Sequence, residues 1–75
     1  MQFHNRAKAL LAEAANVSTV PDNARIGSFE PWDSLTHLRL ILALEQQIGR
    51  QLDPDEAIRI ESLDDIARLL NGGTE

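Results

Sequence analysis

Apolar residues recur along this chain at helical spacing, in stretches separated by polar residues, glycines and prolines. In the stretch 3–15 they fall three, four or seven positions apart, as one face of an amphipathic helix requires; these residues are Phe3, Ala7, Leu10, Leu11 and Ala14. The stretch 34–48 is the most apolar and predicts a second helix, ended by Gly49. We expect its buried face to contain Leu35, Leu38, Ile41, Leu42 and Ile48, with Leu44 at the edge.

Two capping patterns predict further helices in the last third of the chain. Residues 53–56, Asp-Pro-Asp-Glu, combine an N-cap, a proline suited to the first helical position and the acid of a capping box. Residues 62–65, Ser-Leu-Asp-Asp, form a second box soon afterwards, so the helix between them must be short. Along the last helix, Asp64 and Arg68 are spaced to pair on the outer face. Its predicted buried residues are Leu63, Ile66, Ala67 and Leu70.

Between the first two helices, residues 16–33 show no helical period and contain Pro21, Gly27 and Pro31. A loop of this length is uncommon in a small domain, and such loops are usually functional or disordered. Apolar residues spaced through it predict that it is pinned to the core. The expected fold is all-α: one domain, 1–75, built as a small bundle of three main helices plus one short helix, with a long loop between helices 1 and 2.

Composition narrows the classes of function. The 75 residues leave room for one small core, and 43% of them are hydrophobic, with only three aromatics. A formal net charge of −5 would repel a polyanion, so we expect no nucleic-acid partner. The chain has no cysteine, and its two histidines have no companion ligands, so we expect no metal site. No apolar run predicts a membrane span, and residues 1–8 lack the apolar region of a signal peptide. These observations predict a cytoplasmic domain, and we expect a monomer.

Candidate chemistry is concentrated where the long loop meets the second helix, at Asp33-Ser34-Leu35. Asp33 is a good N-cap residue, which would place Ser34 at the helix start. A serine there is partly exposed and held by the backbone behind it. It can be part of a helix cap, a nucleophile, or the point at which a prosthetic group is attached.

The chain resembles the acyl carrier proteins. The resemblance is carried by Asp33-Ser34-Leu35 after a long loop, by Leu44-Glu45 ten residues after the serine, and by the two capped helices that follow, all in a small acidic domain. It implies a four-helix carrier fold with Ser34 as the attachment residue, flanked by Asp33 and Leu35. The implied cofactor is phosphopantetheine, joined to Ser34 from coenzyme A by a phosphopantetheinyl transferase.

The same resemblance implies a function without catalysis by the chain itself. The thiol of the arm would hold an acyl or aminoacyl group as a thioester. The implied partners are an acyl- or aminoacyl-activating ligase and a downstream transferase or synthase. Carriers of fatty acid synthesis usually have a small residue near the position of Trp32 and often acids at the positions of Thr36 and Arg39. These departures favour a specialised, stand-alone carrier.

The residues around Ser34 are candidates for partner docking: Trp32, Thr36, His37 and Arg39. Trp32 either closes over the core, leaving one ring edge exposed, or anchors a partner. We expect His37 at the surface and Thr36 and Arg39 on the exposed side of the helix. The acidic residues of the last third are either a solvated face or a second docking surface.

Two other functions stay open. The chain could be a helical interaction module that keeps the carrier fold without modification. Alternatively, Ser34 and His37, three positions apart, could form a nucleophilic pair as in esterases. Such an enzyme also needs an oxyanion hole and a substrate pocket, for which 75 residues leave little room.

Overall fold

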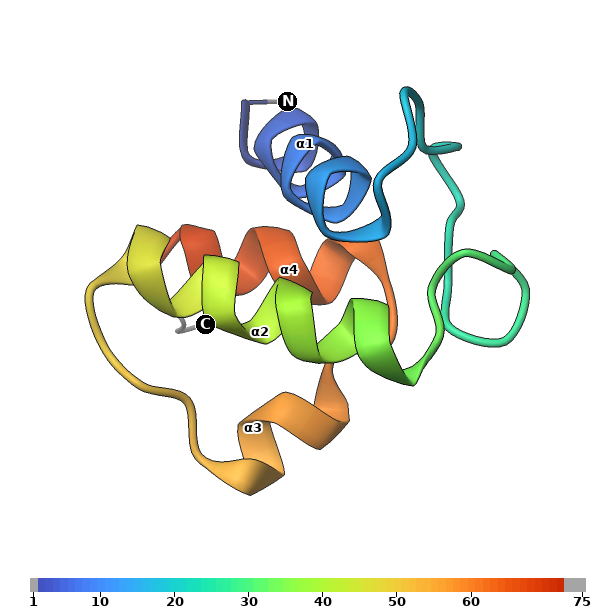
Figure 1. Ribbon diagram of the computed structural model, residues 1–75. Helices are drawn as coiled ribbons and strands as arrows, with labels where there is room; N and C mark the ends of the chain where they lie inside the picture. The colour runs from blue at the N-terminus through green and yellow to red at the C-terminus, as the bar shows by residue number, and fades with distance from the viewer. Residues whose placement is uncertain (1, 73–75) are drawn as a thin grey trace.

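The computed structural model describes residues 2–72, and within that range it contains four helices and no named β-strand. They are α1 (Gln2–Ala15), α2 (Ser34–Ile48), α3 (Pro54–Arg59) and α4 (Leu63–Leu70). α1 packs against both α2 and α4, which also contact each other, while α3 lies on the side of this pair away from α1 (Figure 1). The predicted all-α bundle with a long loop between its first two helices is confirmed. None of the helices in residues 2–72 has the length and apolarity to cross a bilayer.

The helix starts follow the capping signals of the sequence. The Asp33 carboxylate accepts a hydrogen bond from the Thr36 N–H at 2.9 Å, and α2 ends at Gly49, whose φ of 77° lies in the left-handed region. α3 and α4 both begin with the predicted capping boxes, at Asp53 and Ser62. Local sequence therefore sets the boundaries that place Ser34 first in α2.

The buried face of α2 differs from the predicted one. Leu35, Leu38 and Leu42 are each more than half exposed. The buried residues are instead Thr36, Leu40, Ile41 and Leu44. α2 is apolar on both sides, and contact with α1 and α4 selects the second set. The prediction that Leu38 and Leu42 lie in the core is therefore wrong, whereas that for Ile41 is confirmed.

The remaining core follows the predicted stripes more closely. The fully buried side chains include Leu11 of α1 and Leu63 and Ile66 of α4, whereas Leu70 is only half-buried. The long loop contributes Val20 and Trp32 to this core, as expected for a pinned segment.

One predicted ion pair is wrong. Arg68 binds Asp65 at 3.1 Å rather than Asp64. The Asp65 carboxylate also accepts the N–H groups of Glu61 and Ser62, at 2.9 and 3.2 Å. The capping box therefore fixes Asp65 one turn before Arg68, where the guanidinium reaches it.

Candidate functional site

Ser34 is the first residue of α2 and its side chain is exposed. Its hydroxyl forms no hydrogen bond with another residue of the described range 2–72. A serine that served only as a helix cap would direct its oxygen to a backbone N–H of the first turn. Here Asp33 fills that role, and the Ser34 hydroxyl remains available to solvent and to another molecule.

Asp33 gives this serine a fixed position. Besides the side-chain cap, its carbonyl oxygen accepts the His37 N–H at 2.8 Å, which closes the first turn of α2. The hydrogen bond from the Thr36 N–H lowers the pKa of the Asp33 carboxyl below its ordinary value. The carboxylate therefore stays ionised at neutral pH, at the helix end where negative charge is favoured.

An open hollow of about 490 Å³ adjoins Ser34. Its lining comes from the long loop, the start of α2 and α3, and consists of Ile26, Trp32, Asp33, Ser34, His37 and Ile58. Ile26 and Ile58 are 41% and 73% exposed. A group attached to Ser34 would thus find apolar side chains beside it on two separate elements.

His37 connects these elements. Its Nδ1 accepts the Trp32 indole N–H at 3.0 Å, and its Nε2 lies 2.9 Å from the carbonyl oxygen of Ala57 in α3. Because Nδ1 accepts, Nε2 must carry the proton and donate to Ala57. Both ring nitrogens are occupied, so neither is free to act as a base for Ser34. The geometry gives no support to a nucleophilic pair of Ser34 and His37.

The predicted docking residues separate into two groups. Arg39 is exposed, as expected. Thr36 was predicted on the exposed side of α2, and this prediction is wrong. Its side chain is only 7% exposed, because it lies on the side of the helix that faces the core. Trp32 is 3% exposed, which agrees with a core role and leaves little of it to a partner. His37 is half-buried between Trp32 and α3 rather than at the open surface.

The exposed large apolar side chains of the described residues all belong to this region. Ile26 and Ile58 line the hollow, and the others lie on α2, which begins at Ser34; they are Leu35, Leu38 and Leu42. We call these five residues the apolar ring. Sequence reasoning assigned three of them to the core. No signal in the sequence marks these three as a surface, because they recur at the same helical spacing as a buried stripe.

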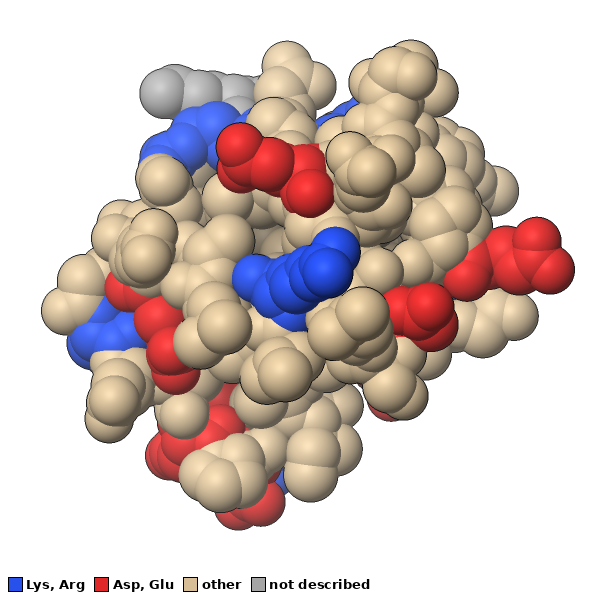
Figure 2. Space-filling view, viewed as in Figure 1, with Lys and Arg blue, Asp and Glu red and all other residues tan. Residues whose placement is uncertain are grey.

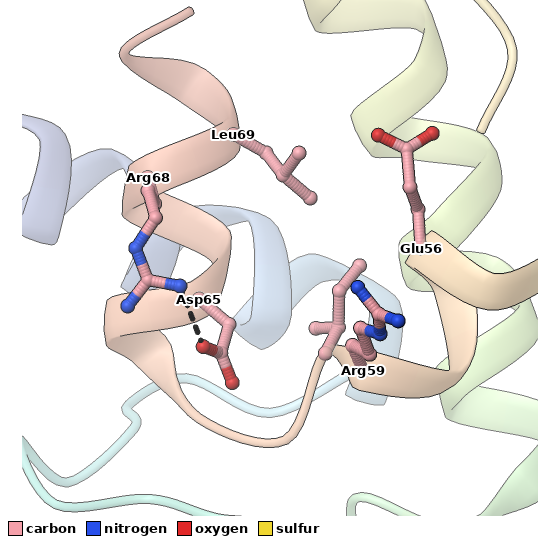
Figure 3. A pocket seen from close by; sticks show the side chains of 6 residues that line it. Glu56, Arg59, Asp65, Arg68 and Leu69 are labelled. Carbon is pink, nitrogen blue, oxygen red and sulfur yellow. Dashed lines mark hydrogen bonds and ion pairs between the residues drawn. The ribbon is translucent and has the colours of Figure 1, made fainter. Parts of the chain in front are cut away.

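A second hollow, of about 160 Å³, lies between α3 and α4 (Figure 3). It is lined by Glu56, Arg59, Ile60, Asp65, Arg68 and Leu69. Glu56 is paired with Arg50, and Asp65 with Arg68. This hollow therefore has largely balanced charge and no nucleophilic side chain.

Comparison of the chain with protein-family models, curated proteins and solved structures gives no match. Function must therefore be inferred from the site and from the sequence that builds it.

Proposed function

We propose that this chain is an acyl carrier protein that holds an acyl or aminoacyl group on a phosphopantetheine arm attached to Ser34. The observation that carries the proposal is the Ser34 hydroxyl, exposed and without a hydrogen-bond partner in residues 2–72, at the capped start of α2 beside an open hollow. A mobile arm needs such an anchor, exposed to enzymes but fixed to a rigid element. The Asp33-Ser34-Leu35 motif and its resemblance to carriers supply the chemical identity of the arm.

The residues around Ser34 fit a phosphodiester. Its oxygen would bond to the pantetheine-bearing phosphorus of coenzyme A, losing its proton, as the pyrophosphate bond breaks and adenosine 3′,5′-bisphosphate leaves. The free end of a helix favours the negative charge of the phosphodiester that remains. Asp33 adds a second negative charge nearby, so the phosphate belongs on the solvent side, where repulsion is screened. When bound, the arm supplies a terminal thiol that holds the cargo as a thioester. Ile26 and Ile58 offer apolar contacts at its base.

The proposal gives the chain no bond chemistry of its own. Its partners would be a phosphopantetheinyl transferase, an activating ligase for the acyl or aminoacyl group, and a downstream transferase or synthase. Tethering would raise the effective concentration of the cargo at each docked enzyme. A monomer working in the cytoplasm suits this exchange of partners.

The test is incubation with coenzyme A and a promiscuous phosphopantetheinyl transferase, followed by intact-mass measurement. We expect the mass to rise by one phosphopantetheine group in the wild type and to stay unchanged in Ser34→Ala. Because Ser34 is exposed, the variant should retain the fold, which circular dichroism checks. An unchanged wild-type mass with several transferases would refute the proposal.

That negative result would favour the second candidate, an unmodified helical interaction module. The observation in its favour is the apolar ring, which offers a contact surface whether or not Ser34 is modified.

A further inference from the structure

Arg39 borders the apolar surface of α2. It follows Leu38 directly and is one helical turn from both Leu35 and Leu42, so the guanidinium shares their side of the helix. All three leucines and Arg39 are exposed. A molecule that covers all three leucines therefore also lies beside this cation.

Arg39 forms no ion pair with a residue of the described range 2–72. Five of the seven basic side chains form a hydrogen bond or ion pair with a described residue, whereas Arg39 and Arg59 form none within 2–72. The single acid of α2, Glu45, instead accepts the Leu52 N–H at 2.8 Å. Figure 2 shows a basic group near the centre of the face in view, with uncharged side chains below it, one acidic group above it and another to its right.

We propose that the enzyme docking at Ser34 presents an apolar surface carrying a carboxylate opposite Arg39. This inference rests on the proposed carrier function and specifies the chemistry of the partner. Apolar contact with the leucines would remove water from the guanidinium, and an unpaired charge in such a contact opposes association. A carboxylate can instead accept two parallel hydrogen bonds from the arginine. The overall charge of −5 would by itself favour a basic partner. The partner surface opposite Arg39 is instead expected to be acidic.

A defined probe is the transferase that modifies Ser34, since it must dock around that residue. Two sets of transferase variants would replace neutral polar side chains at the rim of its carrier-binding surface, one at a time, by Glu or by Lys. The initial rate of transfer would be measured at subsaturating carrier for the wild type and for Arg39→Glu. Arg59→Glu is the matched control, because it makes the same charge change on α3, at the second hollow and on a different element from the exposed leucines of α2.

At one rim position or more, we expect the Glu variant to modify the wild type about two- to fivefold faster than the matched Lys variant. The order should reverse with Arg39→Glu, remain unchanged with Arg59→Glu, and weaken as salt is added. Leu38→Ser should lower the rate with all transferase variants while leaving the helical content unchanged, because Leu38 is 57% exposed.

Any of four results would overturn the inference. Equal responses of Arg39→Glu and Arg59→Glu would show that only net charge matters. Loss of a concentration-dependent dimer in Arg39→Glu, seen by analytical ultracentrifugation, would make a second copy of this chain the occupant of the surface. Transfer to Ser34 that is insensitive to every rim variant would show that Arg39 lies outside the docked contact while leaving the carrier function intact. Absence of any transfer to Ser34 would refute the carrier function itself, and the docking inference with it.

Discussion

His37 joins three parts of the site through one imidazole. The ring accepts a hydrogen bond from Trp32 in the long loop and donates one to the Ala57 carbonyl in α3. It also lies against the Trp32 ring, with centroids 6.1 Å apart and planes inclined by 25°. The imidazole thereby joins the elements that line the hollow beside Ser34.

Replacing His37 with Phe keeps an aromatic ring but removes both hydrogen bonds. We expect a loss of about 1–3 kcal/mol of unfolding free energy, because the buried Trp32 N–H is left without an acceptor. Urea denaturation of the wild type, His37→Phe, Trp32→Phe and the double variant would measure the coupling. The double variant should lose less than the sum of the single losses; strict additivity would contradict this role of His37.

The roles of some of these residues could be predicted from the sequence, and those of others could not. Asp33 and Ser34 were predictable because capping is a local property of the residues at a helix start. The bonds of His37 were not, because Ala57 lies 20 residues away and its position depends on the tertiary fold. A histidine near the start of an apolar helix carries no signal of such a partner.

At the scale of elements, the helical period of the α2 sequence does not determine which side of the helix is buried. Leucines and isoleucines occupy both of its sides, so two different stripes satisfy the helical spacing. Packing against α1 and α4 together requires a broad buried arc, and the arc around Leu40 and Leu44 fits between them. The leucines left outside form an exposed apolar stripe that is open to contact with a partner.

A pair of substitutions tests this assignment. Leu40 is fully buried, so Leu40→Ala should cost about 2–5 kcal/mol. Leu42 is 54% exposed, so Leu42→Ala should change stability by no more than about 0.5 kcal/mol. Thermal and urea unfolding would compare the two variants. Equal losses, or a larger loss for Leu42→Ala, would contradict the observed phase of α2.

α3 is held differently, since none of its residues is buried. Its first turn is fixed by Glu56, which accepts two hydrogen bonds of 3.0 Å from Arg50 and one of 3.1 Å from the Asp53 N–H. The hydrogen bonds from Arg50, followed by that from the Asp53 N–H, lower the pKa of Glu56 from 4.5 to about 2. Polar contacts therefore hold the start of α3 in place, whereas the longer helices are held by residues buried in the apolar core.

This arrangement predicts a dependence of stability on pH. The folded-state pKa of Glu56 is lowered, so its contribution is present above about pH 4.5 and is lost as the pH falls toward 2. Glu56→Gln keeps an acceptor for the capping box but removes the charge. We expect the wild type to be the more stable at pH 7 and the difference to vanish near pH 2, as measured by urea unfolding. A difference independent of pH would contradict the role of the ionised pair.

The whole molecule combines a small helical core with one face that leaves its apolar residues uncovered. The bundle was predictable because apolar spacing and capping boxes are local features of the sequence. The long loop was predictable because prolines and a glycine interrupt the helical pattern there. Which face of α2 would stay open was not predictable, because that depends on how α1, α2 and α4 share a limited core. This open side of α2 begins beside Ser34, the residue that we propose carries the arm.

The most direct test of that proposal is peptide mapping of the protein after reaction with coenzyme A and a phosphopantetheinyl transferase. The chain contains three other serines, Ser18, Ser28 and Ser62, which serve as internal controls. Ser62 accepts the Asp65 N–H in a helix cap, and Ser28 donates to the Arg25 carbonyl. We expect the phosphopantetheine group on the peptide containing Ser34, with fragmentation assigning it to that residue alone. Its presence on any of the other three serines, with Ser34 unmodified, would contradict the account.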